Sequence, residues 1–265
     1  MIDYALPVLY CLFAWWFSTG LIIYLDGLPR RTFRWSNGVA GVAAIAAVVG
    51  LARSSADTSA ASAYLGFTCA LVIWGWHELS FLTGVVTGPR RAQCPAGARG
   101  MRRFRLALEV MLYHELALLA TTALVVMSTF GGANHVGRYT FLILWAMRLS
   151  AKLNIFLGVP NVTEEFLPDH IGYLKSYFKK KPMNLLFPAS VTIATIIAVG
   201  LAQQAAADSL YASATPGYVF LATLMVLAIL EHWLLVLPLP VGRLWSGALS
   251  MRNDPARAEP APLET

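Results

Sequence analysis

Long apolar stretches separated by short polar segments dominate the hydrophobicity pattern along the 265 residues. Runs of about 17–25 apolar residues have the length that an α-helix needs to cross the hydrocarbon core of a bilayer. The pattern predicts an all-α, polytopic membrane bundle of about seven helices, and the second run is the weakest because it is short and rich in Ala, Gly and Val. The predicted spans lie near residues 4–25, 38–52, 61–86, 104–130, 139–157, 184–203 and 217–240.

Positive charge alternates sharply between the segments that connect these spans. One set of segments carries nearly all of the Lys and Arg residues, whereas the opposite set holds only Arg53 and Arg138. Cytoplasmic loops of membrane proteins carry an excess of Lys and Arg. The set of segments rich in Lys and Arg is therefore predicted to be cytoplasmic, with the N-terminus outside and the C-terminus inside. The rich set comprises the segments near 26–37, 87–103 and 158–183 and the segment after 240.

Composition supports a membrane protein and excludes several classes. The chain is 57% apolar and 13% charged, with a mean hydropathy of +0.60, whereas a soluble domain carries about 25% charged residues. The net charge of +6 follows from the topology, so the predicted partner is the lipid bilayer and no nucleic acid is expected. Three widely separated cysteines argue against a disulfide framework, an iron–sulfur cluster and covalent haem attachment.

One transmembrane domain is predicted over residues 1–252, followed by a disordered tail over 253–265 that is rich in Pro, Ala and Glu. Before the sixth span, Pro168 suits the first turn of a helix. Apolar residues then recur at helical spacing and four lysines follow, which predicts an amphipathic helix on the cytoplasmic interface near 168–181. The recurring apolar residues are Ile171, Leu174 and Phe178.

Ionisable residues recur inside the apolar spans, where they are costly and mark functional sites. Three spans each carry an adjacent pair: His77 with Glu78, His114 with Glu115, and Glu231 with His232. Each pair lies about 12–15 Å from the predicted cytoplasmic end of its span, at the rise of an α-helix. The fifth span adds Arg148 and Lys152 four residues apart, hence on one face. We therefore predict one polar layer in the inner half of the bilayer.

The chemistry of this layer has several interpretations. Four carboxylates, with Glu109 included, face two cations, which leaves two negative charges unbalanced. A divalent cation, protons, or Glu109 reaching the headgroups would balance them. Imidazole and carboxylate together suit iron or zinc, which predicts the six paired residues as metal ligands and Arg148 and Lys152 as their charge partners. A polar packing network between helices and ligation of a pigment by a histidine are the alternatives. Adjacent residues point about 100° apart on a helix, which counts against a di-iron arrangement.

A further group of polar residues precedes the predicted interfacial helix, at the cytoplasmic mouth of the bundle. These residues are interpreted as a gate to the buried cluster, as further ligands, or as a surface for a basic partner, and an ordinary solvated turn is the alternative. They are Glu164, Glu165, Asp169 and His170.

The stretch over residues 145–195 carries a family resemblance. It reads WAMRLSAKLNIFLGVPNVTEEFLPDHIGYLKSYFKKKPMNLLFPASVTIAT and closely resembles the PuhE family of photosynthetic complex assembly proteins of phototrophic purple bacteria. The resemblance implies a role in reaction-centre assembly or bacteriochlorophyll supply in the bacterial inner, or intracytoplasmic, membrane. The partners that it implies are photosynthetic reaction-centre subunits, light-harvesting subunits or pigment-synthesis proteins. It implies no catalytic residues.

Two function hypotheses follow. The first is an integral membrane assembly factor that holds a pigment, a metal or a nascent subunit at the polar layer, with bacteriochlorophyll or a divalent metal (iron or zinc) as the bound species. The second is a membrane-embedded, metal-dependent oxidoreductase acting on a tetrapyrrole or a carotenoid. A transporter is less favoured, because the sequence shows neither paired interrupted helices nor an internal repeat.

Overall fold

The structure is a computed structural model of the whole chain, and it describes residues 2–162, 164–207, 212, 214–239 and 241–252. The tail that the sequence predicts to be disordered, residues 253–265, lies outside the described residues.

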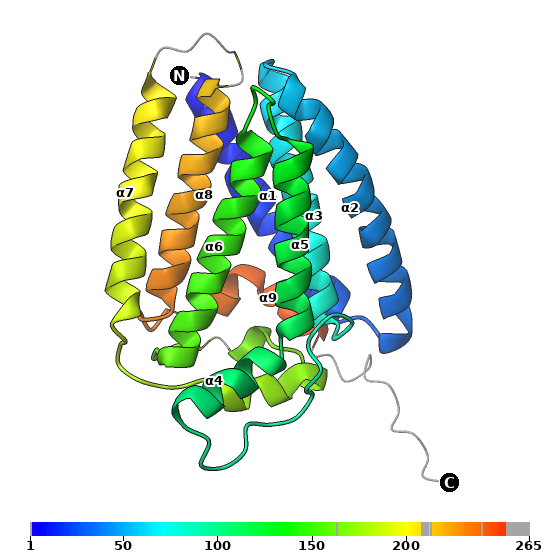
Figure 1. The fold of residues 1–265 in the computed structure, drawn as a ribbon, viewed down its shortest axis with the longest axis vertical. Helices are drawn as coiled ribbons and strands as arrows, with labels where there is room; N and C mark the ends of the chain where they lie inside the picture. Colours follow the sequence, from blue (N-terminus) through cyan, green and yellow to red (C-terminus); the bar gives the residue numbers. More distant parts are fainter. Residues whose placement is uncertain (1, 163, 208–211, 213, 240, 253–265) are drawn as a thin grey trace.

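Long helices that run alternately up and down form the bundle (Figure 1). Shorter elements, among them α4 (Gly100–Glu109) and α9 (Ser246–Arg252), form a layer across its lower end. The 3-10 turns are η1 (Arg30–Thr32), η2 (Glu164–Phe166), η3 (Asp169–Tyr177) and η4 (Val241–Trp245). The long helices are α1 (Ile2–Asp26), α2 (Phe33–Ala56), α3 (Ala60–Leu82), α5 (Leu112–Ser128), α6 (Val136–Leu157), α7 (Leu186–Ala206) and α8 (Ala214–Leu234).

The predicted fold class, an all-α membrane bundle, is confirmed. In the described part of the chain, six helices are long and apolar enough to cross a membrane, namely α1, α2, α3, α6, α7 and α8. A seventh span is counted if α4 and α5 are taken together, although they are bent by 68°. The weak second run belongs to a helix of 24 residues, α2, which is longer than its apolar stretch. The chain is therefore a multi-pass membrane protein.

The fourth predicted span, 104–130, is divided in the structure. α4 ends at Glu109 and α5 begins at Leu112. The amide of His114 donates a hydrogen bond to the carbonyl of Thr87 (2.9 Å), so it does not continue the helical ladder back to Val110. α4 also carries three arginines, which favour the interface over the hydrocarbon core. The apolar part of the predicted span is therefore α5, whose 17 residues count as a crossing only together with α4.

The helix predicted near 168–181 corresponds to a shorter 3-10 helix. The chain forms 3-10 turns over Asp169–Tyr177, with a non-helical residue at Ile171. A 3-10 helix has about three residues per turn, so the buried side chains are Ile171, Leu174 and Tyr177 in place of the predicted set that ended at Phe178. They pack on Phe81 of α3, so the apolar face of this segment contacts protein.

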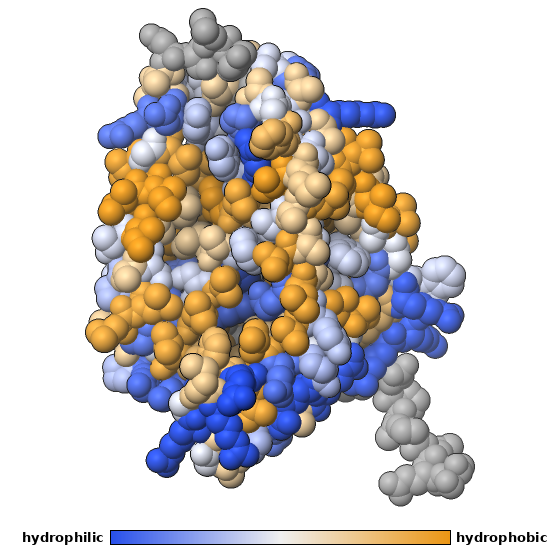
Figure 2. All heavy atoms as spheres, viewed as in Figure 1, coloured by the Kyte–Doolittle hydropathy of each residue, from blue (hydrophilic) through white to orange (hydrophobic). Residues whose placement is uncertain are grey.

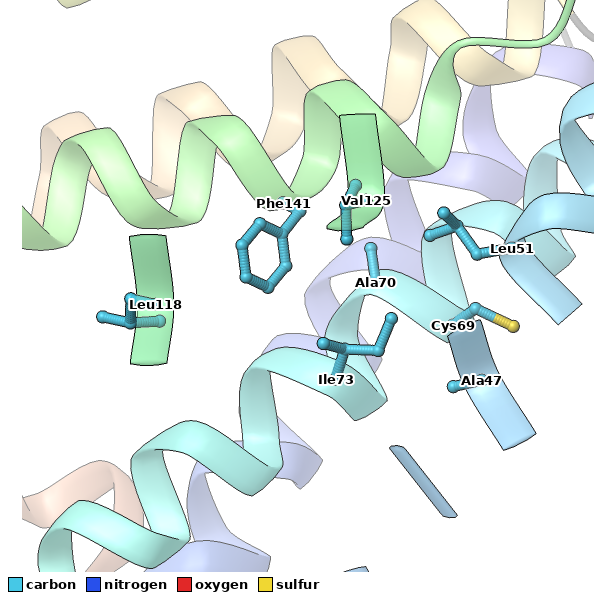
Figure 3. Close-up of a cluster of buried hydrophobic side chains, with 8 residues drawn as sticks. All are labelled: Ala47, Leu51, Cys69, Ala70, Ile73, Leu118, Val125 and Phe141. Atoms are coloured by element: carbon cyan, nitrogen blue, oxygen red, sulfur yellow. The ribbon is translucent and has the colours of Figure 1, made fainter. Parts of the chain in front are cut away.

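Small and branched apolar residues hold α2, α3, α5 and α6 together (Figure 3). Leu51, Ile73 and Phe141 are almost fully buried in this cluster, which also includes Ala47 and Ala70. Lipid tails are as apolar as these side chains, so helix association in a membrane depends on close packing, and small residues allow it.

The closest approach of α3 and α6 involves two glycines. A Cβ atom added at Gly137 would lie 2.7 Å from the carbonyl oxygen of Gly66, and one added at Gly66 would lie 3.2 Å from the amide nitrogen of Gly137. Backbone atoms cannot move aside as a flexible side chain does. The contact therefore sets the spacing of these two helices near the upper end of the bundle.

We expect Gly137→Leu to lower the free energy of unfolding by about 2–3 kcal/mol, because the added side chain pushes α3 and α6 apart. The matched control is Gly38→Leu in α2, where an added Cβ meets nothing within 4 Å. Unfolding in mixed detergent micelles, followed by circular dichroism, measures the difference. Equal stability of the two variants would contradict this account.

Polar side chains gather at the two ends of the molecule, and apolar side chains form the band between them (Figure 2). The lower end holds the basic connecting segments between α1 and α2, between α3 and α4, and between α6 and α7 (Figure 1). The charge alternation in the sequence thus corresponds to one basic end of the bundle. The cytoplasmic location of that end stays a prediction.

Candidate functional site: a charged cavity within the bundle

A cavity of about 460 Å³ lies between α1, α3, α6 and α8 and is closed below by α4 and the η3 segment. Its walls are mostly apolar and aromatic, as at Trp15, Trp74, Met147, Leu227 and Phe104. Cavities of roughly 300–1,000 Å³ with apolar walls and a few polar groups are typical of small-molecule sites. Figure 2 shows polar surface recessed between apolar side chains at the level of the lower halves of α5 and α6.

Five charged residues contribute to the wall of this cavity. Arg148 of α6 donates to Glu78 of α3 at 3.0 Å, and Lys152 of α6 donates to Glu115 of α5 at 2.7 Å. The remaining carboxylate, Glu231 of α8, accepts a hydrogen bond from the indole nitrogen of Trp15 at 2.8 Å. All five line the cavity, so charged side chains of α3, α5, α6 and α8 meet at one site.

The cavity wall carries one carboxylate more than it has cations. Two ion pairs account for Glu78 and Glu115, and among the described residues no Lys or Arg forms an ion pair with Glu231. Glu109, included in the charge count from the sequence, ends α4 in the lower layer and does not line the cavity. The Arg148 side chain is 43% exposed, so its guanidinium is accessible to a molecule in the cavity.

The histidines turn away from this cavity. His77, His114 and His232 are 0–1% exposed, and none of them lines it. The reason is helical geometry, since neighbouring residues point about 100° apart and only one member of each His/Glu pair faces the cavity. The predicted site is therefore divided into a carboxylate face and a buried histidine face.

A hydroxyl group lies beside a ring nitrogen of two of the buried histidines. His77 Nε2 lies 2.9 Å from Thr121 Oγ1, while its Nδ1 has no hydrogen-bond partner. His232 Nδ1 donates to the carbonyl of Ala228 (2.8 Å), and its Nε2 lies 2.9 Å from Ser150 Oγ. The sequence analysis missed Thr121 and Ser150 as partners. The sequence feature that could have indicated such a partner is the polar Ser150 within the apolar span. It lies between Arg148 and Lys152 in the sequence and points to another face of α6.

His114 is the exception among the three histidines. Neither of its ring nitrogens has a hydrogen-bond partner, and its ring centroid lies 6.3 Å from that of His77. In the part of the chain that the structure describes, no group of three or more His, Cys, Asp or Glu side chains is arranged to hold a metal ion. The six predicted metal ligands therefore do not form a single site there.

The residues predicted at the cytoplasmic mouth do not line the charged cavity either. Glu164 forms an exposed ion pair with Lys180 at 2.9 Å, and Asp169 is exposed. His170 Nε2 lies 2.7 Å from the carbonyl oxygen of Leu82. The side chain of Glu165 lies outside the described part of the structure. The apolar neighbours of these residues close the cavity instead, namely Phe166, Leu167 and Leu174.

Comparison with known proteins places this architecture in a family. The family described as "Protein of unknown function (DUF3623)" matches residues 1–256. The chain belongs to the DUF3623 family. A relative from Rhodobacter capsulatus, described as an uncharacterized 30.4 kDa protein in the puhA 5' region, is 41% identical over 263 residues, which cover 97% of this chain and 96% of the relative. No solved structure matches the chain.

Proposed function

We propose that this protein takes part in building the bacterial photosynthetic apparatus and that it holds a small, largely apolar cargo in the charged cavity. The resemblance of residues 145–195 to the PuhE family supports the process. The relative from Rhodobacter capsulatus, described as lying in the puhA 5' region, supports it further. The membrane in which it acts is then the inner or intracytoplasmic membrane of a phototrophic bacterium.

The cavity itself is the observation that supports the cargo. Its walls match an apolar molecule, whereas Arg148, Lys152 and Glu231 offer charge and hydrogen bonds to a few polar substituents. A transmembrane helix of a nascent subunit, about 30 Å long and 10–12 Å wide, occupies roughly 2,400–3,400 Å³ by its dimensions. The cavity of about 460 Å³ has instead the size of a small-molecule site, which favours a pigment or a pigment precursor over a subunit helix.

The polar groups of the cavity determine how such a pigment would be held. His77, His114 and His232 do not reach the cavity, so the cargo is bound through its carbonyl, carboxyl or hydroxyl substituents and not through a histidine. Arg148 of α6 supplies donors, and Glu231 of α8, which accepts from Trp15, supplies an acceptor. No observation favours the metal-dependent oxidoreductase.

Filling the cavity tests this proposal. Gly75 of α3 lines the cavity, and an added Cβ there meets nothing within 4 Å, so Gly75→Phe places a ring in the cavity without a backbone clash. The matched control is Gly38→Phe, at an exposed position of α2 with the same open surroundings. We expect protein purified in mild detergent from a phototrophic host to retain a pigment in the wild type and in Gly38→Phe, and to lose it in Gly75→Phe.

The absorption spectrum and mass spectrometry of an organic extract identify the retained molecule. Thermal unfolding of each sample shows that the variant is folded. If the wild type retains no pigment, or if Gly75→Phe retains as much as the control, the proposed function is wrong.

A further inference from the structure

A second, smaller cavity of about 180 Å³ lies at the basic end of the bundle and shares no lining residue with the charged cavity. It forms where η1, the beginning of α2, the end of α3 and the η3 segment meet. The loop between α3 and α4 completes its rim. Its lining residues are Arg30, Phe33, Thr83, Gly84, Arg91, His170, Ile171 and Tyr173.

Cationic side chains from separate parts of the chain converge on this pocket. Arg30 follows α1, and Arg91 belongs to the loop after α3. Arg91 donates to the carbonyl of Gly84 at 3.1 Å, which holds its guanidinium at the rim. Among the described residues neither arginine forms an ion pair. Both guanidinium groups therefore keep donors for an anion.

The floor of the pocket is built from a glycine and a histidine. Gly84 has a φ of +74°, and an added Cβ would lie 3.3 Å from Cδ2 of His170. The hydrogen bond from His170 Nε2 to Leu82 (2.7 Å) and the ring contact with Phe33 (centroids 5.5 Å apart) hold the imidazole in place. Asp169, next to His170 in the sequence, is exposed, and Asp26, four residues before Arg30, is buried; neither carboxylate lines the pocket.

The pocket lies where α2 begins, at the end of a membrane-spanning helix. Phe33 lines it, and the next turns of α2 carry strongly exposed apolar side chains, with Trp35 68%, Val39 71% and Val42 69% accessible. These three side chains point about 120–180° away from Phe33 around the helix, so they do not line the pocket. In a membrane-spanning helix such a face contacts lipid tails, which places the pocket close to the surrounding lipid.

We propose that this pocket binds the phosphate of an anionic phospholipid of the surrounding bilayer, with Arg30 and Arg91 as the two guanidinium ligands. The planar donors of arginine match phosphate oxygens in pairs. Basic pockets between transmembrane helices are known sites for anionic headgroups. This inference does not depend on the cargo of the charged cavity.

Native mass spectrometry of the full chain released from nanodiscs tests this site. The nanodiscs contain phosphatidylcholine with a minor fraction of phosphatidylglycerol. We expect the wild type to retain phosphatidylglycerol, and the double variant Arg30→Gln with Arg91→Gln to retain about tenfold less, because it loses charged hydrogen bonds. The matched control is Arg99→Gln with Arg102→Gln, which removes the same charge from the same basic end without touching the pocket.

Three outcomes decide the matter. Retention by the control at the wild-type level, with loss in the pocket variant, supports the site, whereas equal loss in both variants shows only general surface attraction and overturns it. Binding of inorganic phosphate in pure phosphatidylcholine nanodiscs, without retention of phosphatidylglycerol, overturns the lipid as occupant. Should the Gln variant fail to fold, Arg30→Lys with Arg91→Lys keeps both charges but loses the paired donors, and retention at the wild-type level then overturns the proposal.

Discussion

Lys152→Met is expected to lower the free energy of unfolding by about 3–5 kcal/mol, because it leaves a carboxylate buried without its counter-ion. The ammonium of Lys152 lies 2.7 Å from Glu115, and the two side chains are only 15% and 16% accessible. The same pair joins α5 to α6 on the wall of the charged cavity. Unfolding in mixed micelles, followed by circular dichroism, measures the loss.

The double variant Glu115→Gln with Lys152→Met provides the control. Removing both charges avoids the unpaired carboxylate, so the double variant is expected to recover a large part of the stability that the single variant loses. Losses that simply add would mean that Lys152 and Glu115 do not act as a pair. The ion pair would then have no part in holding α5 against α6.

Gly88→Ala is expected to cause a loss of similar size, about 3 kcal/mol or more, because the added methyl group meets only backbone. The new Cβ would overlap the carbonyl oxygen of Glu109 and would lie 2.6 Å from the carbonyl carbon of Val110. These atoms belong to the break between α4 and α5, which forms part of the cavity floor. The variant therefore disturbs both the fold and the closure of the cavity.

Gly172→Ala is the matched control for Gly88→Ala. Gly172 lies in the same lower layer, within η3, and an added Cβ there meets nothing within 4 Å. We expect this control to unfold within about 0.5 kcal/mol of the wild type. The yield of folded protein and its thermal unfolding temperature in detergent distinguish the two variants. A stable Gly88→Ala protein would show that the α4–α5 break can shift without cost.

The sequence by itself determined the bundle and the level of its polar layer. Apolar runs of membrane-spanning length can satisfy their backbone hydrogen bonds in lipid only as helices, so their number and order follow from hydrophobicity. An ionisable side chain pointing into lipid costs about 2.5–3.5 kcal/mol on insertion scales. Residues such as Glu78, Arg148 and Lys152 are therefore expected to face the interior, and all three line the cavity.

Only the tertiary structure decided which residues meet. Helical spacing leaves the rotation of each helix open, and a rotation of about 100° exchanges the two members of a His/Glu pair. Packing turned Glu231 to the cavity and His232 to Ser150, which separated the predicted metal ligands. Likewise, the break before α5 depends on the Thr87 carbonyl that accepts from His114, a contact between segments distant in the sequence. Such contacts carry no periodic signal in the chain, because they arise when separate helices are brought together.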